Sequence, residues 1–139
     1  MSQKTMELYI HIPFCVKKCQ YCDFLSFAAA TQAAYVEALL REIAYYGPHC
    51  SDYLVSTVYI GGGTPSWLTE EWMAQIMSAV RRSFRLASDA EISIECNPGT
   101  VTDHKFAGYR NAGINRISIG LQSAVDEELK ILGRIHTFD

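Results

Sequence analysis

Short segments rich in β-branched residues alternate with longer segments of helical periodicity along the whole chain. Strands are predicted at 8–12, 56–60, 91–96 and 116–121, and a helix is predicted after each of them. The helices are expected to begin near Thr31, Thr69, Thr102 and Asp126, and Gly47–Pro48 is expected to end the first one. Because strands that alternate with helices of this length form right-handed βαβ units, the sequence predicts an α/β fold with a parallel sheet and four such units.

Segments of unusual composition lie where a predicted strand ends and its loop begins. They are a cysteine-rich segment at 15–22, three glycines at 61–63, and the polar stretches 95–99 and 120–123. In a parallel βα barrel or a doubly wound sheet these points converge on one face, where active sites are built. The sequence therefore predicts one functional site at the carboxyl ends of the strands.

The composition is that of one globular domain without a charged binding face. The chain has 139 residues, 49% of them hydrophobic, and its 12 basic and 15 acidic side chains give a formal net charge of −3. This balance argues against nucleic acid or an anionic membrane surface as the main partner. No stretch approaches the roughly 20 apolar residues of a membrane span, and the N-terminus has no signal-peptide pattern. We therefore expect a soluble cytoplasmic protein.

Cys15, Cys19 and Cys22 have the spacing C-x3-C-x2-C and supply three thiolates from one loop. Such clustering in a cytosolic chain favours metal or cofactor ligation over disulfides. A structural zinc ion normally takes four ligands, so it would also need His11 or Cys50. An iron–sulfur cluster held by three cysteines instead keeps one iron free for an exogenous ligand. We favour the cluster, and the alternatives are structural zinc and a loop of unliganded thiols.

Two further candidate ligand-binding features lie at the ends of the second and third predicted strands. The glycines at 61–63 would let a ligand approach backbone N–H and C=O groups closely, because glycine has no Cβ; the alternative is a plain turn. Glu95 lies on the opposite side of its strand from Ile92 and Ile94, which places it inside a barrel or on a site wall. Its carboxylate is either a hydrogen-bonded structural group or a bidentate acceptor for vicinal hydroxyls such as those of ribose.

The chain resembles a known family in five separated motifs that occur in order. The cysteine motif at 15–22 looks like the cluster-binding loop of radical S-adenosylmethionine (SAM) proteins, and GGGTP at 61–65 is similar to their methionine-binding glycine segment. More narrowly, segments 9–15, 59–66, 95–100, 115–123 and 132–136 resemble the oxygen-independent coproporphyrinogen III oxidase family. The resemblance implies a radical SAM partial TIM barrel. Residues 1–139 would be the N-terminal part of its one core domain, and the rest of the barrel and a C-terminal domain would lie outside this chain.

The resemblance also implies two cofactors and the residues that hold them. Cys15, Cys19 and Cys22 would bind three irons of a 4Fe-4S cluster, and the fourth iron would chelate SAM. The positions that contact this SAM or lie beside it are Tyr9, Tyr21, Gly62 and Glu95, with Glu95 on the ribose hydroxyls. The positions that line a second SAM site in the oxidase are Gly63, Thr64, Gln122 and Arg134.

The family divides into the oxidase proper and a heme chaperone branch. The cluster motif of the oxidase continues with a further cysteine two residues after the third, whereas this chain has Phe24 there, which is the chaperone-like form. We therefore expect a protein that binds heme or a porphyrin, transfers heme to recipient hemoproteins and has an electron donor. The alternative is coproporphyrinogen III dehydrogenase, which uses SAM to convert propionates to vinyl groups with loss of CO2. A zinc-bound structural module is a more remote alternative.

Overall fold

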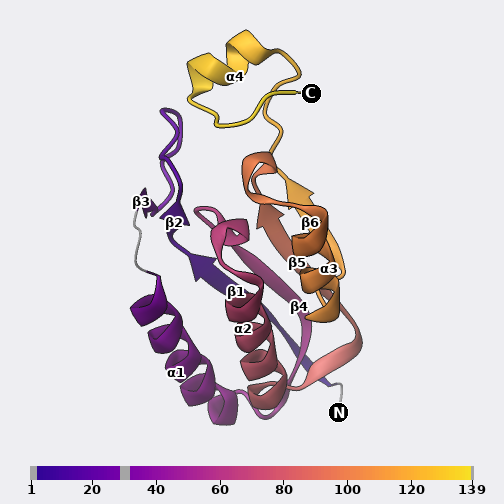
Figure 1. Ribbon diagram of the computed structural model, residues 1–139. Coiled ribbons are helices and arrows are strands. Elements are labelled where there is room, and N and C mark those ends of the chain that lie inside the picture. The colour runs from indigo at the N-terminus through magenta and orange to yellow at the C-terminus, as the bar shows by residue number, and fades with distance from the viewer. Residues whose placement is uncertain (1–2, 29–31, 139) are drawn as a thin grey trace.

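The computed structural model of the protein describes residues 3–28 and 32–138, and its centre is a four-stranded sheet (Figure 1). The strands, in their order across the sheet, are β1 (Lys4–Ile12), β4 (Tyr53–Gly62), β5 (Leu86–Cys96) and β6 (Arg116–Ile119). Every neighbouring pair is parallel. The α/β fold with a parallel sheet, predicted from the alternation of segments, is confirmed.

Three helices cover one face of the sheet: α1 (Ala33–His49), α2 (Glu70–Ser83) and α3 (Asp103–Asn111) (Figure 1). Two of them begin where the sequence predicts, because the Thr69 side chain accepts from Trp72 N and the Thr102 side chain accepts from Lys105 N. Alternate strand residues face these helices and are almost inaccessible to solvent, namely Ile10, Ile12, Val58, Ile60, Ile92 and Ile94. The polar residues of the same strands are therefore left on the opposite face.

The first helix differs from its prediction. The expected cap, Thr31, lies outside the described residues, and the helix has Gln32 as its N-cap. The helix also continues through Gly47 and Pro48 to His49, so the prediction that these two residues end it is wrong. A Cβ on Gly47 would lie 2.6 Å from the carbonyl oxygen of Ser83, so this glycine permits the close approach of α1 to α2.

Two short strands that the sequence does not predict close the base of the cysteine loop. β2 (Phe14–Cys15) pairs in parallel with β3 (Phe27–Ala28), and Phe27 N donates to Pro13 O at 2.9 Å. Two residues are too few to show a periodicity, which is why pattern reading misses them. Two single-turn helices, η1 (Pro65–Trp67) and η2 (Pro98–Thr100), follow β4 and β5.

The C-terminal segment lies beyond the carboxyl ends of the strands (Figure 1). It contains α4 (Asp126–Leu132), which begins at the predicted residue but does not continue to the end of the chain as expected, because Gly133 ends it in a left-handed conformation. β6 ends at Ile119, two residues before its predicted end, because Leu121 N turns back to donate to Ile119 O at 3.1 Å. Within residues 3–28 and 32–138, no helix has the length and apolar character needed to cross a membrane.

Candidate cofactor site

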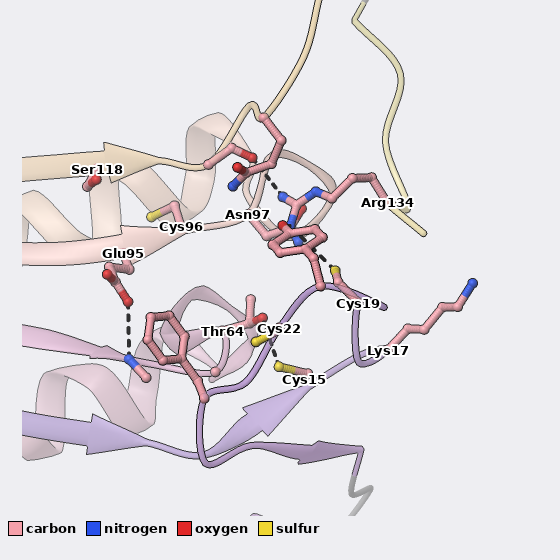
Figure 2. Close-up of a pocket in the computed structure, with 16 residues that line it drawn as sticks. Cys15, Lys17, Cys19, Cys22, Thr64, Glu95, Cys96, Asn97, Ser118 and Arg134 are labelled. Carbon is pink, nitrogen blue, oxygen red and sulfur yellow. Dashed lines mark hydrogen bonds between the residues drawn. The ribbon is translucent and has the colours of Figure 1, made fainter. Parts of the chain in front are cut away.

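A pocket of about 270 Å³ opens at the carboxyl ends of the strands, between the cysteine loop and the segment after β6 (Figure 2). The segments of unusual composition converge on this pocket, as the sequence predicts. All but one of the residues proposed for cofactor binding line it: Cys15, Cys19, Tyr21, Cys22, Gly62, Gly63, Thr64, Glu95, Gln122 and Arg134. The remaining residue, Tyr9, lies outside the lining.

Cys15 is fixed by its contacts with the end of β4. It is buried, and its sulfur accepts a hydrogen bond from Thr64 Oγ1 at 3.6 Å (Figure 2). Thr64 N donates to the carbonyl oxygen of Phe14 at 2.7 Å. Because the backbone and the side chain of Thr64 both contact β2, the Cys15 sulfur has a defined position beside the glycine segment.

Gly62 and Gly63 hold the end of β4 against the strand that leads to Cys15. Gly63 N donates to Ile12 O at 2.8 Å, and Gly62 has a φ angle of +117°. A Cβ on Gly63 would lie 2.6 Å from Phe14 O and 3.0 Å from Cys15 Sγ. The positive φ at one position and the close approach at the other both require glycine. The segment can therefore present bare backbone to a ligand beside the cysteine sulfur.

Cys19 and Cys22 lie in the loop beyond β2 and are partly exposed. Cys22 N donates to Cys19 O at 3.2 Å, which closes a tight turn between them. The Lys18 ammonium reaches across the loop to the carbonyl oxygens of Phe24, at 3.2 Å, and Ser26, at 3.5 Å. Local polar contacts therefore hold this part of the loop in place.

Arg134 reaches the same loop from the segment after α4. Its Nη1 donates to Cys19 Sγ at 3.7 Å and to the Tyr21 hydroxyl at 3.4 Å, and its Nη2 donates to Gly120 O at 2.7 Å. Burial raises the pKa of Tyr21, while the neighbouring guanidinium acts in the opposite direction. The contacts of Arg134 bring together three parts of the chain that are distant in sequence.

Glu95 lies on the pocket wall and accepts two hydrogen bonds. The Tyr59 hydroxyl donates to Oε1 at 2.8 Å. Gly62 N donates to Oε2 at 3.1 Å (Figure 2). Burial and, after it, the hydrogen bond to Glu95 raise the pKa of Tyr59 to about 12, so the phenol remains a donor at neutral pH. A carboxylate has about four lone-pair sites, so two remain for the hydroxyl groups of a ligand. The structural and the ligand-binding interpretations of Glu95 are therefore compatible.

Tyr9 and Gln122 mark the two edges of the site. Tyr9 is 57% exposed, stacks on Tyr59 with 6.2 Å between ring centroids, and its hydroxyl contacts His11 Nδ1 at 3.0 Å. Gln122 has a φ angle of +71°, which is uncommon for a residue other than glycine. Residues held in such conformations cluster at functional sites, in keeping with the position of Gln122 in the pocket lining.

The donor set fits an iron–sulfur cluster, because three thiolates from one loop can bind three irons and leave the fourth free for an exogenous ligand. In a 4Fe-4S cluster each cysteine binds a different iron, so the three thiolates lie further apart than around one ion. The fourth ligands that zinc would need are engaged or distant. Both ring nitrogens of His11 contact oxygen atoms of Tyr9 and Leu25, and Cys50 caps the end of α1 that precedes β4.

Some lining residues are missed by sequence reasoning. Cys96 alternates with the core residues Ile92 and Ile94 and is buried, but it also lines the pocket, and burial raises the pKa of its thiol to about 11. Ser118, which lies in the motif at 115–123 but is given no role by it, lies opposite Glu95 in the register of β5 and β6 and also lines the pocket. The available signal was its alternation with Ile117 and Ile119, which places it on the polar face of the strand.

The fold and the pocket are those of an α/β protein with a candidate site at the carboxyl ends of a parallel sheet, lined by three cysteines from one loop. The sequence pattern of the Radical SAM superfamily matches residues 9–139, and the chain belongs to this superfamily. Membership implies a 4Fe-4S cluster and SAM as the cofactors.

Individual relatives match nearly the whole chain. The heme chaperone HemW of Escherichia coli (strain K12) is 48% identical over 134 residues, which are 94% of this chain and 35% of the relative. The mitochondrial radical S-adenosyl methionine domain-containing protein 1 of Bos taurus is 37% identical over 138 residues, which are 98% of this chain and 31% of the relative.

A solved structure confirms the predicted radical SAM fold. It is described as coproporphyrinogen III oxidase (HemN) from Escherichia coli, a radical SAM enzyme, and it superposes with a TM-score of 0.90 at 33% identity. The match covers 96% of this chain and 32% of that one. The chain therefore spans about a third of the length of the relatives that it matches.

Proposed function

We propose that this protein is a heme chaperone with a radical SAM core, which binds heme and transfers it to hemoproteins in the cytoplasm. Relatives named heme chaperone HemW support the proposal, at 48% identity in Escherichia coli and 44% in Synechocystis. The coproporphyrinogen III oxidase structure is 33% identical to this chain. The similarity in sequence therefore favours the chaperone over the oxidase.

The presence of Phe24 in the cysteine loop is the main support for this proposal. It lines the pocket at the position where the oxidase motif has a further cysteine, and its side chain is 64% exposed. Its carbonyl oxygen accepts hydrogen bonds from Lys18 Nζ at 3.2 Å and from Ser26 Oγ at 3.4 Å. The loop thus has a defined path here, and an aromatic ring replaces the thiol on which the oxidase motif depends.

The proposal assigns the cofactors to the pocket at the carboxyl ends of the strands. Cys15, Cys19 and Cys22 would hold the 4Fe-4S cluster, and reductive cleavage of SAM is the chemistry that the cluster supplies when bound. Gly62 offers backbone beside Cys15, and Glu95 offers two free lone-pair sites to ribose hydroxyls. The further positions proposed for SAM contacts are Tyr9, Tyr21, Gly63, Thr64, Gln122 and Arg134. The proposed partners also include an external electron donor that reduces the cluster.

The cluster is tested by replacing the cysteines one at a time in the full-length protein, purified anaerobically. Cys15→Ala, Cys19→Ala and Cys22→Ala should each lose most of the iron and sulfide that the wild type binds. Cys96→Ala is the matched control, because Cys96 lines the same pocket outside the cysteine motif, and it should keep both. A colourless wild type with one zinc per chain would overturn the cluster and support the zinc module.

The chaperone function is tested by two assays on the same full-length preparation. Titration with heme, followed by absorbance, should give stoichiometric binding. Anaerobic incubation with coproporphyrinogen III, SAM and a reductant should give neither CO2 nor vinyl product, while a coproporphyrinogen III oxidase assayed in parallel shows that the reagents work. Vinyl product from the wild type would replace this proposal with the dehydrogenase.

A further inference from the structure

Arg134 contacts the cysteine motif from 115 residues away in sequence. Its backbone position is set by the end of α4, where Gly133 adopts a left-handed conformation and Arg134 N donates to Leu129 O at 2.9 Å. The side chain then extends to Cys19, whose sulfur accepts from Nη1 at 3.7 Å (Figure 2). A helix end therefore positions the guanidinium that reaches the loop.

The guanidinium is held on both sides. Nη2 donates to Gly120 O at 2.7 Å and Nη1 also donates to the Tyr21 hydroxyl, so the group spans from the end of β6 to the cysteine loop. Its Nε is buried and has no hydrogen-bond partner within the described residues. A planar guanidinium fixed by contacts at both ends keeps its charge in one place.

The other cations near the cysteines do not contact a sulfur. Lys18 is engaged with the carbonyl oxygens of Phe24 and Ser26, and the Lys17 ammonium points away from the cysteine sulfurs (Figure 2). Within residues 3–28 and 32–138, the Cys15 sulfur accepts only from the neutral hydroxyl of Thr64. Among the residues that the structure describes, Arg134 is thus the cation that donates a hydrogen bond to a sulfur of the motif.

We propose that Arg134 is a positioning residue that stabilises the Cys19 thiolate and raises the reduction potential of the cluster. The inference rests on the proposed cluster ligands. Reduction adds a negative charge to the cluster, and a nearby guanidinium favours the more negative state. Hydrogen bonds to the sulfurs and the local net charge are two of the factors that set the potential of iron–sulfur clusters. This role differs from contact with a second SAM, because Nη1 is directed to Cys19.

The test is a redox titration of the reconstituted full-length protein, followed by electron paramagnetic resonance. Arg134→Gln should reduce the equilibrium constant for one-electron reduction at least about tenfold, which corresponds to a potential lower by about 59 mV. Arg134→Lys keeps the charge and should recover part of this difference. Lys17→Gln removes one positive charge from the same pocket without a contact to sulfur, so its potential should change by less than half as much.

The outcomes separate this inference from the proposed function. A wild type that binds no cluster would overturn the function, whereas a cluster whose potential is the same in the wild type and Arg134→Gln would overturn only the role of Arg134. Weaker SAM binding at an unchanged potential would likewise assign Arg134 to SAM alone. If Arg134→Gln loses its cluster, the test uses Arg134→Lys, which keeps the charge. A potential close to that of the wild type would then support the charge-based role, whereas a potential lower by about 59 mV or more, or loss of the cluster in this variant too, would overturn it.

Discussion

The pocket wall consists of two halves that are held in different ways. The core half comprises the ends of β2, β4 and β5, which carry Cys15, the glycine segment and Glu95. It continues directly into strands whose Ile60 and Ile94 have no exposed surface. The loop half comprises residues 16–26 and 120–138. Most of its large apolar side chains are exposed, including Leu25 at 76% and Ile131 at 72%, whereas Leu129 is buried.

The difference indicates which part of the site is formed before a cofactor binds. The core half is fixed by the packing that stabilises the whole sheet. The loop half depends on a small number of polar contacts, such as those of Lys18 and Arg134. Regions with few buried apolar contacts open at low free-energy cost, and a ligand that binds only the closed form stabilises it. We therefore expect cofactor binding to order the loop half much more than the core half.

The largest difference should come from the same truncation made in each half. Ile60→Ala should lower the free energy of unfolding by about 2–5 kcal/mol, because it leaves a cavity in a fully buried site. Ile131→Ala should change it by less than about 0.5 kcal/mol, because this side chain is 72% exposed. Chemical denaturation followed by circular dichroism measures both values. Equal losses would contradict the division into two halves.

A smaller loss of stability is expected from substitution of Gly63, which follows β4 and packs against the strand that leads to Cys15. Gly63→Ala should destabilise the protein by about 1–3 kcal/mol and lower its iron content, because the added Cβ meets backbone atoms of Phe14. Gly99→Ala is the control, since its Cβ would come closest to the side chain of Ile135, which can move. If both variants keep the wild-type iron content and stability, the close approach at Gly63 is not required.

The hydrogen bond between Tyr59 and Glu95 should appear as a pH dependence of stability. The pKa of Tyr59 is raised from 10 to about 12, chiefly by burial. Its contribution to folding is therefore complete below about pH 10 and is lost as the pH rises towards about 12. Tyr59→Phe should flatten this part of the stability profile, and Tyr46→Phe, at a half-exposed tyrosine, should not. Parallel profiles for all three proteins would argue against this account.

The smallest effect concerns the reactivity of the cysteines in the cluster-free protein. Cys19 and Cys22 are partly exposed, whereas Cys15 and Cys96 are buried and the pKa of Cys96 is about 11. Alkylation followed by mass spectrometry should therefore label Cys19 and Cys22 before Cys15 and Cys96, because the exposed thiolate is the reactive form. Faster labelling of Cys15 than of Cys19 would show that the core half opens more readily than the loop half.

Sequence reasoning worked best where the deciding contacts are local. The caps at Thr69 and Thr102 and the start of α4 depend on residues within one helical turn. The prediction for Gly47–Pro48 was wrong because the deciding contact, with Ser83, lies in another helix. Most candidate site residues reached one pocket because each lies at the end of a parallel strand, and parallel strands bring their carboxyl ends together.

The sequence by itself determined the order of strands and helices, the spacing of three thiols on one loop and the presence of polar residues at the strand ends. Only the tertiary structure decided that Tyr59 donates to Glu95, that β3 pairs with β2, and that Arg134 reaches Cys19. The physical reason is distance along the chain. Periodicity and capping arise between near neighbours, whereas these contacts join residues that folding brings together and that leave no local pattern.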